Sequence, residues 1–138
     1  MNATEFRGSC LCGAVQYSVR SPWIRFVHCH CGRCRKATGS AHASNLFAPA
    51  DALTWTLGGE NVQRFDLPTA ASFATCFCRT CGGPLPHLTR NGRAWVVPAG
   101  TLDECPDLAP QARIFWGSRV PWSCPDGGLS TFDGPPEG

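Results

Sequence analysis

The sequence lacks long hydrophobic runs, and none approaches the ~20 residues that a helix needs to span a bilayer. Residues 1–7 contain no apolar stretch like that of a signal peptide, so the sequence predicts neither a membrane span nor secretion. Charge of one sign is also scarce, because the net charge is only +2 and no basic stripe or tail is visible. Binding to nucleic acid or to a membrane surface is therefore not expected.

Helical patterns are equally scarce. Only one methionine is present, and no segment of ordinary helix length has apolar residues at helical spacing. With 15 glycines and 12 prolines in 138 residues, the composition favours strands and loops. The length indicates a single domain over residues 1–138, with a core at 6–124 and a loose tail at 125–138 that is rich in Gly, Pro and Asp.

Cysteine, in contrast, is abundant, with 10 in 138 residues. A chain this rich in cysteine is commonly either a secreted disulfide scaffold or a metalloprotein of a reducing compartment. Here the cysteines cluster as C-x-C and C-x-x-C groups, and no signal peptide is visible. We therefore interpret them as a zinc framework in a cytoplasmic protein rather than as disulfides.

The densest group lies in residues 28–35, which read HCHCGRCR. Cys29, Cys31 and Cys34 are spaced C-x-C-x-x-C. A short loop that turns back on itself can direct such thiolates at one ion, with Zn–S bonds of about 2.3 Å. The flanking cations lower the thiol pKa values and help to neutralise the thiolates. A zinc knuckle without chemistry is an equally good interpretation of this segment taken alone.

A second set of cysteines is split between two distant segments. Cys10 and Cys12 alternate in an extended stretch, so both side chains point to one face, and Gly13 lets the chain turn away. Cys78 and Cys81 form a C-x-x-C followed by Gly-Gly, which is typical of a zinc knuckle because glycines let backbone N–H groups approach the sulfurs. Together the thiols would complete one tetrahedral site that ties the first strand to the middle of the chain.

Alternating and apolar segments predict a series of short strands. They are expected at residues 14–19, 23–27, 41–47, 53–57, 62–65, 73–77, 95–102 and 114–116. Gly58 and Gly59 predict a hairpin between the strands 53–57 and 62–65. A single helical turn is expected at residues 35–40, closed by Gly39. The predicted fold class is all-β, with small antiparallel sheets held together by zinc and little helix.

Five motifs occur in order between Gly8 and Trp122: GSCLCGAV, HCHCGRCRKATGSA, FCRTCG, AGTLD and SRVPW. This pattern resembles the glutathione-dependent formaldehyde-activating enzyme (GFA) family, which also includes centromere protein V. The resemblance implies a β-tent-like fold with two zinc ions per chain. It places a structural zinc on four cysteines, namely Cys10, Cys12, Cys78 and Cys81. It places a second, open zinc on three cysteines, namely Cys29, Cys31 and Cys34. It also implies a zinc-dependent carbon–sulfur lyase that condenses glutathione with formaldehyde to S-hydroxymethylglutathione.

Physical chemistry agrees with this division. Three thiolates on Zn²⁺ leave a charge of −1, so the ion activates water poorly and is better suited to bind a soft thiolate as fourth ligand. Arg33, Arg35 and Lys36 are placed to offset the resulting charge and to bind glutathione carboxylates, with a solvated basic turn as the alternative. Arg119 and Trp122 lie in the family-like SRVPW motif and are further candidates for the pocket, with a core position as the alternative for Trp122.

The histidines carry weaker interpretations. His28 and His30 flank the first ligand and are candidates for proton transfer or for an alternative ligand, although a structural role is favoured. His42 and His87 lie in apolar surroundings and are interpreted as structural.

The remaining cysteines are not assigned to either metal set. Cys76 shares a strand and a face with Cys78, so it could approach the structural zinc, and we interpret it as a bystander. Cys105 and Cys124 are isolated in the sequence and receive no role.

Two alternatives to the named reaction stay open. One is a related enzyme that uses the same open zinc with another thiol or aldehyde, and the other is a zinc-stabilised binding module without catalysis. A zinc deaminase is excluded, because no H-x-E accompanies the C-x-x-C. The expected partners are a small thiol such as glutathione and a small aldehyde, and the sequence does not predict the oligomeric state.

Overall fold

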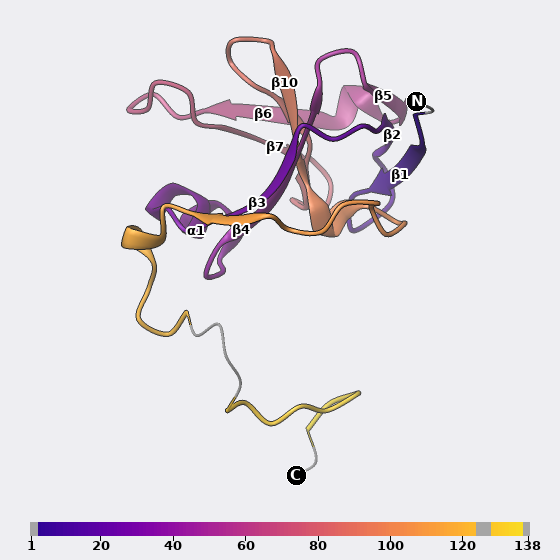
Figure 1. The fold of residues 1–138 in the computed structure, drawn as a ribbon. Coiled ribbons are helices and arrows are strands. Elements are labelled where there is room, and N and C mark those ends of the chain that lie inside the picture. The colour runs from indigo at the N-terminus through magenta and orange to yellow at the C-terminus, as the bar shows by residue number, and fades with distance from the viewer. Residues whose placement is uncertain (1–2, 124–127, 137–138) are drawn as a thin grey trace.

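Three small sheets make up the described chain, which comprises residues 3–123 and 128–136 of the computed structural model (Figure 1). The first sheet has the order β1 (Glu5–Ser9), β2 (Gln16–Arg20), β5 (Leu53–Leu57). The second has the order β11 (Ala112–Ile114), β3 (Arg25–Cys29), β4 (Ala43–Pro49), β10 (Ala94–Pro98), β9 (His87–Leu88). The third has the order β6 (Val62–Asp66), β7 (Ala74–Cys78), β8 (Pro84–Leu85). The helical elements are α1 (Gly32–Thr38) and the 3₁₀ turns η1 (Gly59–Asn61), η2 (Ala99–Thr101) and η3 (Trp116–Ser118).

This architecture is the predicted all-β fold of small sheets. The strands pair antiparallel, apart from β11, which pairs parallel with β3. In residues 3–123 and 128–136, no helix is long and apolar enough to cross a membrane. Within the expected tail, residues 128–136 are exposed, and Cys124 lies outside the described residues.

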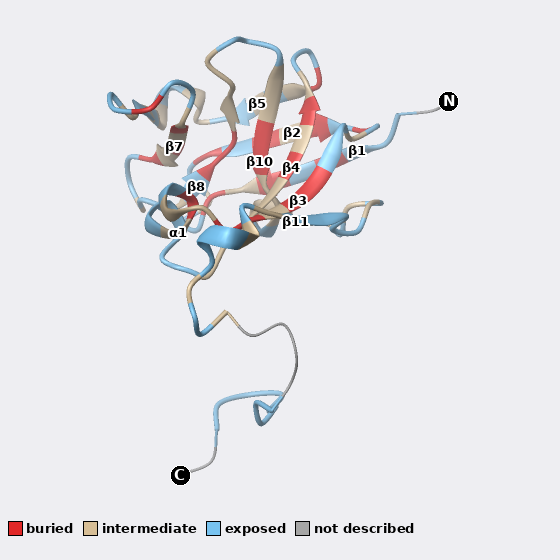
Figure 2. Cartoon of the chain, turned by 60° about the vertical axis from the view of Figure 1, so that its left-hand side comes forward, coloured by how far each residue is buried: buried red, intermediate tan, exposed pale blue. Residues whose placement is uncertain are grey.

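The main hydrophobic core lies on one face of the five-stranded sheet. Phe26, Leu46 and Val97 occupy one row across β3, β4 and β10, and all three are buried. Tyr17 and Val19 of β2 pack in the same cluster, so the alternation predicted for this segment is confirmed. In Figure 2 the buried residues accordingly follow β2, β3, β4 and β10 through the centre of the molecule.

The opposite face of the same sheet carries the chemistry-bearing side chains. Because successive residues of a strand point to opposite faces, the neighbours of the core row in sequence face away from the core. Val27 pairs with Asn45, which in turn pairs with Pro98, and Cys29 pairs with Ala43 one row further along. This second face is therefore where the thiol of Cys29 and the carboxamide of Asn45 are brought onto one surface.

The expected hairpin between β5 and β6 is wrong. β5 pairs with β2, whereas β6 pairs with β7 in another sheet. The glycines instead begin η1, with Gly58 in the left-handed region at φ +71°. A Cβ at Gly58 would lie 2.0 Å from the carbonyl oxygen of Ala14, so the turn is held close against the start of β2 and directs the chain away.

The helix is longer than the single turn expected from the sequence. It begins within the cysteine motif, where the Sγ of the N-cap residue Cys31 accepts a hydrogen bond from the Cys34 N–H at 3.3 Å. It ends as predicted at Gly39, which is left-handed at φ +65°.

Two predicted strands also end earlier than expected. β10 gives way to η2 after Pro98, and β11 ends at Ile114. Phe115 then takes a left-handed conformation at φ 54° and begins η3, so the predicted strand 114–116 covers only the end of β11.

Candidate metal centres and the adjoining cavity

Four cysteines from two distant segments converge on one point. Cys10 and Cys12 follow β1, whereas Cys78 ends β7 and Cys81 lies in the turn after it. Their Sγ atoms all lie within 4.8 Å of one another, with 3.7 Å between Cys10 and Cys12 and 3.9 Å between Cys12 and Cys78. A tetrahedral ion with Zn–S bonds of about 2.3 Å requires S···S separations of about 3.8 Å. The four thiols therefore fit one tetrahedral zinc.

Donors around this cluster favour thiolates. Backbone N–H groups of Val15 and Gly83 donate to the Sγ atoms of Cys10 and Cys81, each at 3.4 Å. Hydrogen bonding from Gly83 lowers the pKa of Cys81 to about 6. A Cβ at Gly83 would lie 3.2 Å from that sulfur, which explains why a glycine suits this position. Hydrogen-bond donors of this kind orient metal ligands and stabilise their charge.

Three further cysteines form a separate cluster at the junction of β3 and α1. Cys29 ends β3, Cys31 caps the helix, and Cys34 lies in its first turn, with Sγ atoms within 4.8 Å of one another. The hydrogen bond with Cys34 lowers the pKa of Cys29 to about 6, and the same bond raises the pKa of Cys34. Among the described residues, no fourth Cys, His, Asp or Glu joins this group. Three sulfur ligands fit a metal that keeps one coordination position open.

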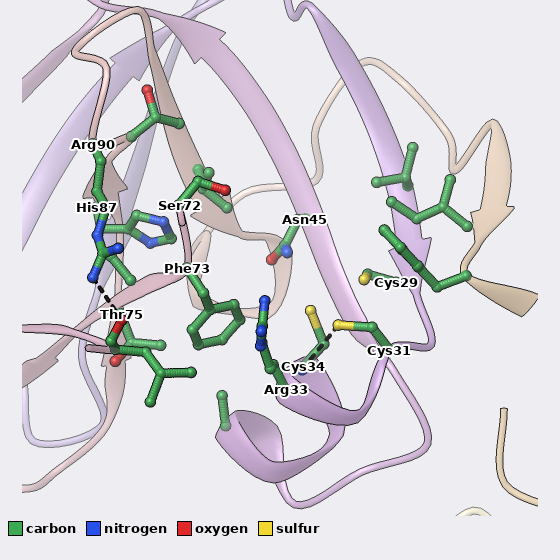
Figure 3. A pocket seen from close by; sticks show the side chains of 18 of the residues that line it. Cys29, Cys31, Arg33, Cys34, Asn45, Ser72, Phe73, Thr75, His87 and Arg90 are labelled. Atoms are coloured by element: carbon green, nitrogen blue, oxygen red, sulfur yellow. Dashed lines mark hydrogen bonds between the residues drawn. The ribbon is translucent and has the colours of Figure 1, made fainter. Parts of the chain in front are cut away.

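This three-cysteine cluster opens into a cavity of about 1220 Å³. Figure 3 shows Cys29, Cys31 and Cys34 on one side of it and His87 and Arg90 across from them. Its lining includes several aromatic side chains, namely Phe47, Phe65, Phe73 and Phe115. The cavity thus has the thiols in one wall, His87 and Arg90 in the wall across from them (Figure 3), and aromatic rings in its lining.

Cations gather in the same lining, as the sequence led us to expect. Arg33, Arg35 and Lys36 of α1 all contribute to it. The Nε of Arg35 is buried and has no hydrogen-bond partner in the described part of the chain. An unpaired buried donor on a cation is costly, so this guanidinium is suited to receive an anionic group.

The lining also contains cations that sequence reasoning missed. Arg25 lies over the ring of Phe47 at 4.4 Å. Arg90 donates to the carbonyl oxygens of Ala70 at 2.6 Å and Leu67 at 2.9 Å, so it braces the loop that precedes β7. No local motif marks either residue, because β3 and the turn between β9 and β10 bring them to the cavity only in the folded chain.

Arg119 and Trp122 are not among the residues that line this cavity. The guanidinium of Arg119 packs on the ring of Trp116 at 4.4 Å and donates to its carbonyl oxygen. Trp122 is 66% exposed, so it is not a core residue either. The family-like motif therefore does not bring these two side chains to the three-cysteine cluster.

The histidines divide between the two faces of the five-stranded sheet. His28 stacks on His42, with ring centroids 4.1 Å apart, and His30 packs between His42 and Trp116. His87, in contrast, lines the cavity. Burial, followed by the charge of Arg64, lowers its pKa to about 4. The structural interpretation of His87 thus missed its place on the wall opposite the thiols.

The remaining described cysteines stay outside both clusters. Cys76 packs in the small core beside Cys10 and Cys78, but it is not part of the four-sulfur group. Burial raises its pKa, which suits a neutral thiol. Cys105 is exposed.

Comparisons with known proteins agree with the site. Residues 5–118 match the family defined as glutathione-dependent formaldehyde-activating enzyme. A Halomonas elongata protein, provisionally named as such an enzyme, is 50% identical over 48 residues, which span 33% of this chain and 31% of that protein. A crystal structure of a Rhodobacter sphaeroides protein is similar with a TM-score of 0.61 and 26% identity, covering 78% of this chain and 98% of its own. Because the family match extends over most of the sequence and includes both cysteine clusters, the chain belongs to the glutathione-dependent formaldehyde-activating enzyme family.

Proposed function

We propose that this protein is a zinc-dependent carbon–sulfur lyase that condenses glutathione, or a similar thiol, with formaldehyde to S-hydroxymethylglutathione. The observation that carries this proposal is the three-cysteine cluster that opens into a large cavity beside cations. Zinc held by Cys29, Cys31 and Cys34 would supply an open coordination position that a thiolate sulfur can occupy. The four-cysteine set would hold a second, structural zinc.

The chain's own cations support an anionic thiol as substrate. Glutathione carries two carboxylates, and its bound sulfur adds another negative charge to a cluster that is already anionic. Arg33, Arg35 and Lys36 are the residues we propose to bind these carboxylates, because all three line the cavity. Arg119 and Trp122 stand outside the lining of this cavity, so the proposal that they bind substrate rests on the family-like motif alone.

The proposed reaction balances without an added redox partner. The thiol gives up its proton to water, and the sulfur electron pair forms a bond to the carbonyl carbon of formaldehyde. The π pair of the C=O bond moves to oxygen, which takes up one proton from water. The product is the S-hydroxymethyl adduct, a hemithioacetal whose new group is uncharged, and the reverse reaction follows the same path.

A related enzyme that uses a larger aldehyde is the second candidate function. The observation that favours it is the aromatic part of the cavity lining, for which formaldehyde has no apolar group. A cytoplasmic location is part of the proposed function, since the nine described cysteines form no disulfide and cysteines in reducing compartments ordinarily stay unpaired or bind metal.

The test uses the protein loaded with Co²⁺, because a further sulfur ligand changes the thiolate-to-metal absorption. Glutathione should change this spectrum and S-methylglutathione should not. Exchange NMR at equilibrium should then show faster interconversion of free and adducted glutathione, and Cys31→Ser should abolish the effect. A cobalt spectrum that responds without faster exchange would keep the thiol site and exclude formaldehyde as the electrophile. No response in either experiment would overturn the glutathione assignment.

A further inference from the structure

Two amide side chains line the cavity beside the three-cysteine cluster, and of these Asn45, unlike Asn91, lies on a strand that pairs with the strand of Cys29. Asn45 lies in the middle of β4, paired with Val27 on one side and Pro98 on the other. Cys29 pairs with Ala43, two residues before Asn45 on the same face of β4. Asn45 is therefore the diagonal neighbour of Cys29, and such neighbours lie about 7–8 Å apart at their Cα atoms. Its carboxamide and the Cys29 thiol face the same space.

The surroundings of this carboxamide leave it unpaired. Asn45 is half-buried, and the flanking side chains of its row are apolar. Among the side-chain hydrogen bonds of residues 3–123 and 128–136, none involves Asn45. The neighbouring residue, Ser44, instead pairs with the Nδ1 of His42 at 3.4 Å. A side-chain amide that lines a cavity without a protein partner keeps its N–H donors available to a ligand.

Figure 3 places the Asn45 side chain between the two walls of the cavity, with the thiols of Cys29 and Cys34 on one side and Phe73 on the other. Asn45 and Cys34 also both line a second cavity of about 260 Å³ that continues along the same sheet face. An aldehyde that approaches a sulfur held at the thiol cluster would therefore meet this amide before it meets the far wall.

The proposed chemistry needs a hydrogen-bond donor at this place. When sulfur attacks a carbonyl carbon, negative charge develops on the carbonyl oxygen, and a fixed N–H donor in a partly dry site stabilises that charge. The cations of α1 are placed for carboxylates, whereas Arg25 packs on the ring of Phe47 and Arg90 donates to backbone carbonyls. A neutral carboxamide adds no charge to the site, and its N–H group can donate the hydrogen bond without losing its proton.

We propose that Asn45 is a catalytic residue that donates a hydrogen bond from its Nδ2 to the aldehyde oxygen of the electrophile. This inference rests on the proposed condensation of a thiol with an aldehyde. The thiolate forms the C–S bond, the oxygen receives the π pair while it is bonded to Asn45, and water then supplies its proton. Asn45 itself neither gains nor loses a proton.

The decisive variants are Asn45→Ala and Asn45→Asp. Alanine removes the donor, and aspartate keeps the shape but offers only acceptors at neutral pH. Both should slow the glutathione–formaldehyde exchange by about 100-fold, in the range found when one oxyanion donor is removed. The affinity for glutathione alone, followed with the cobalt-loaded protein, should stay within about twofold for Asn45→Ala. Ser44→Ala is the matched control on the same strand and should exchange like the parent protein.

A second measurement does not depend on turnover. The side-chain amide signal of Asn45 in a ¹⁵N NMR spectrum is assigned by its loss in Asn45→Asp. It should shift when formaldehyde and glutathione are added together, and much less with glutathione alone. Metal content and circular dichroism verify that the variants are folded.

Three results would overturn the inference in distinguishable ways. If both Asn45 variants exchange glutathione and its adduct as fast as the parent protein, Asn45 has no role in the reaction, while the proposed function stands. Equal losses of exchange and of glutathione affinity in Asn45→Ala would place Asn45 in thiol binding or in the fold rather than at the aldehyde oxygen. A parent protein that does not accelerate exchange at all would overturn the proposed function, and the role of Asn45 with it.

Discussion

At the scale of single residues, the wall opposite the thiols contains a histidine that titrates far from its ordinary range. His87 lines the cavity at β9, and burial together with the nearby Arg64 lowers its pKa from 6.5 to about 4. The carboxylate of Asp66 acts in the opposite direction but is the smallest of these influences. The folded protein therefore keeps His87 neutral at a pH where the unfolded chain already binds a proton.

A pH dependence of stability follows from this shift. Because the unfolded state binds more protons between pH 6.5 and 4, the free energy of unfolding falls as the pH is lowered through this window. Relative to His87→Gln, the parent protein should lose about 2 kcal/mol between pH 7.5 and pH 5. Urea unfolding of both proteins at the two pH values measures the difference, in which the titration of the cysteine ligands cancels. Parallel losses in the two proteins would contradict the shift.

Gly8 shows how closely the core approaches the backbone of β1. A Cβ at this position would lie 2.2 Å from Cζ of Tyr17, whose hydroxyl hydrogen-bonds with Thr101 at 2.6 Å. Gly8→Ala must therefore displace a buried ring and should destabilise the protein by about 2–3 kcal/mol. Gly117→Ala, where nothing lies within 4 Å of the added atom, is the matched control and should change the free energy of unfolding by less than about 0.5 kcal/mol. Thermal or urea unfolding measures both, and equal values would refute the close contact.

At the scale of elements, α1 and the four-cysteine turns use cysteine in different ways. Cys31 caps a helix that starts at the edge of the cavity, whereas Cys78 ends the middle strand of a sheet and is fully buried. Serine is itself a good N-cap, so replacing Cys31 keeps the helix start while removing a sulfur ligand. Replacing Cys78 removes one of the four sulfur ligands through which a zinc ion would join β1 to β7.

Two substitutions separate these uses. Cys31→Ser should leave the fold intact and abolish the response of the cobalt spectrum to glutathione. Cys78→Ser should unfold the protein or strongly destabilise it, because metal binding at a closed site contributes directly to folding. Circular dichroism and thermal unfolding compare the two variants. Equal unfolding by both would show that the three-cysteine cluster is structural, and the binding-module alternative would gain support.

At the scale of the whole molecule, the four-cysteine set joins segments that are far apart in sequence. It attaches the end of β1 to the third sheet, whose strands otherwise pair only with one another. The other cluster lies on the five-stranded sheet and opens to the cavity. Two separate ligand sets in one chain imply two ions of different affinity.

The fully loaded protein should contain two zinc ions per chain. The ion at the three-cysteine cluster should be the weaker of the two, because it has one protein ligand fewer. A graded chelator titration followed by elemental analysis should therefore remove one ion before the other, with the fold retained after the first loss. A content of one zinc per chain after purification with added zinc would contradict the two-site arrangement.

Much of the site could be predicted because ligand spacing is a local property. A C-x-x-C turn or a C-x-C strand brings its sulfurs together whatever the rest of the chain does, and the structure groups Cys29, Cys31 and Cys34 accordingly. The β5–β6 hairpin failed for the complementary reason. Its prediction used only Gly58 and Gly59, whereas the actual partner of β5 is β2, an edge that no local signal describes.

By itself, the sequence determined the strand pattern, the C-x-C and C-x-x-C groups and the family motifs, since alternation and ligand spacing need only neighbouring residues. The tertiary structure decided that Cys10 and Cys12 meet Cys78 and Cys81. Only the tertiary structure decided which other groups share the cavity with the thiols. Asn45 and His87 reach it because β10 pairs with β4 on one side and with β9 on the other, and Arg119 stays outside because its side chain packs on Trp116. Strand pairing is a competition among all edges of the chain, so the composition of a cavity wall is known only after every edge has found its partner.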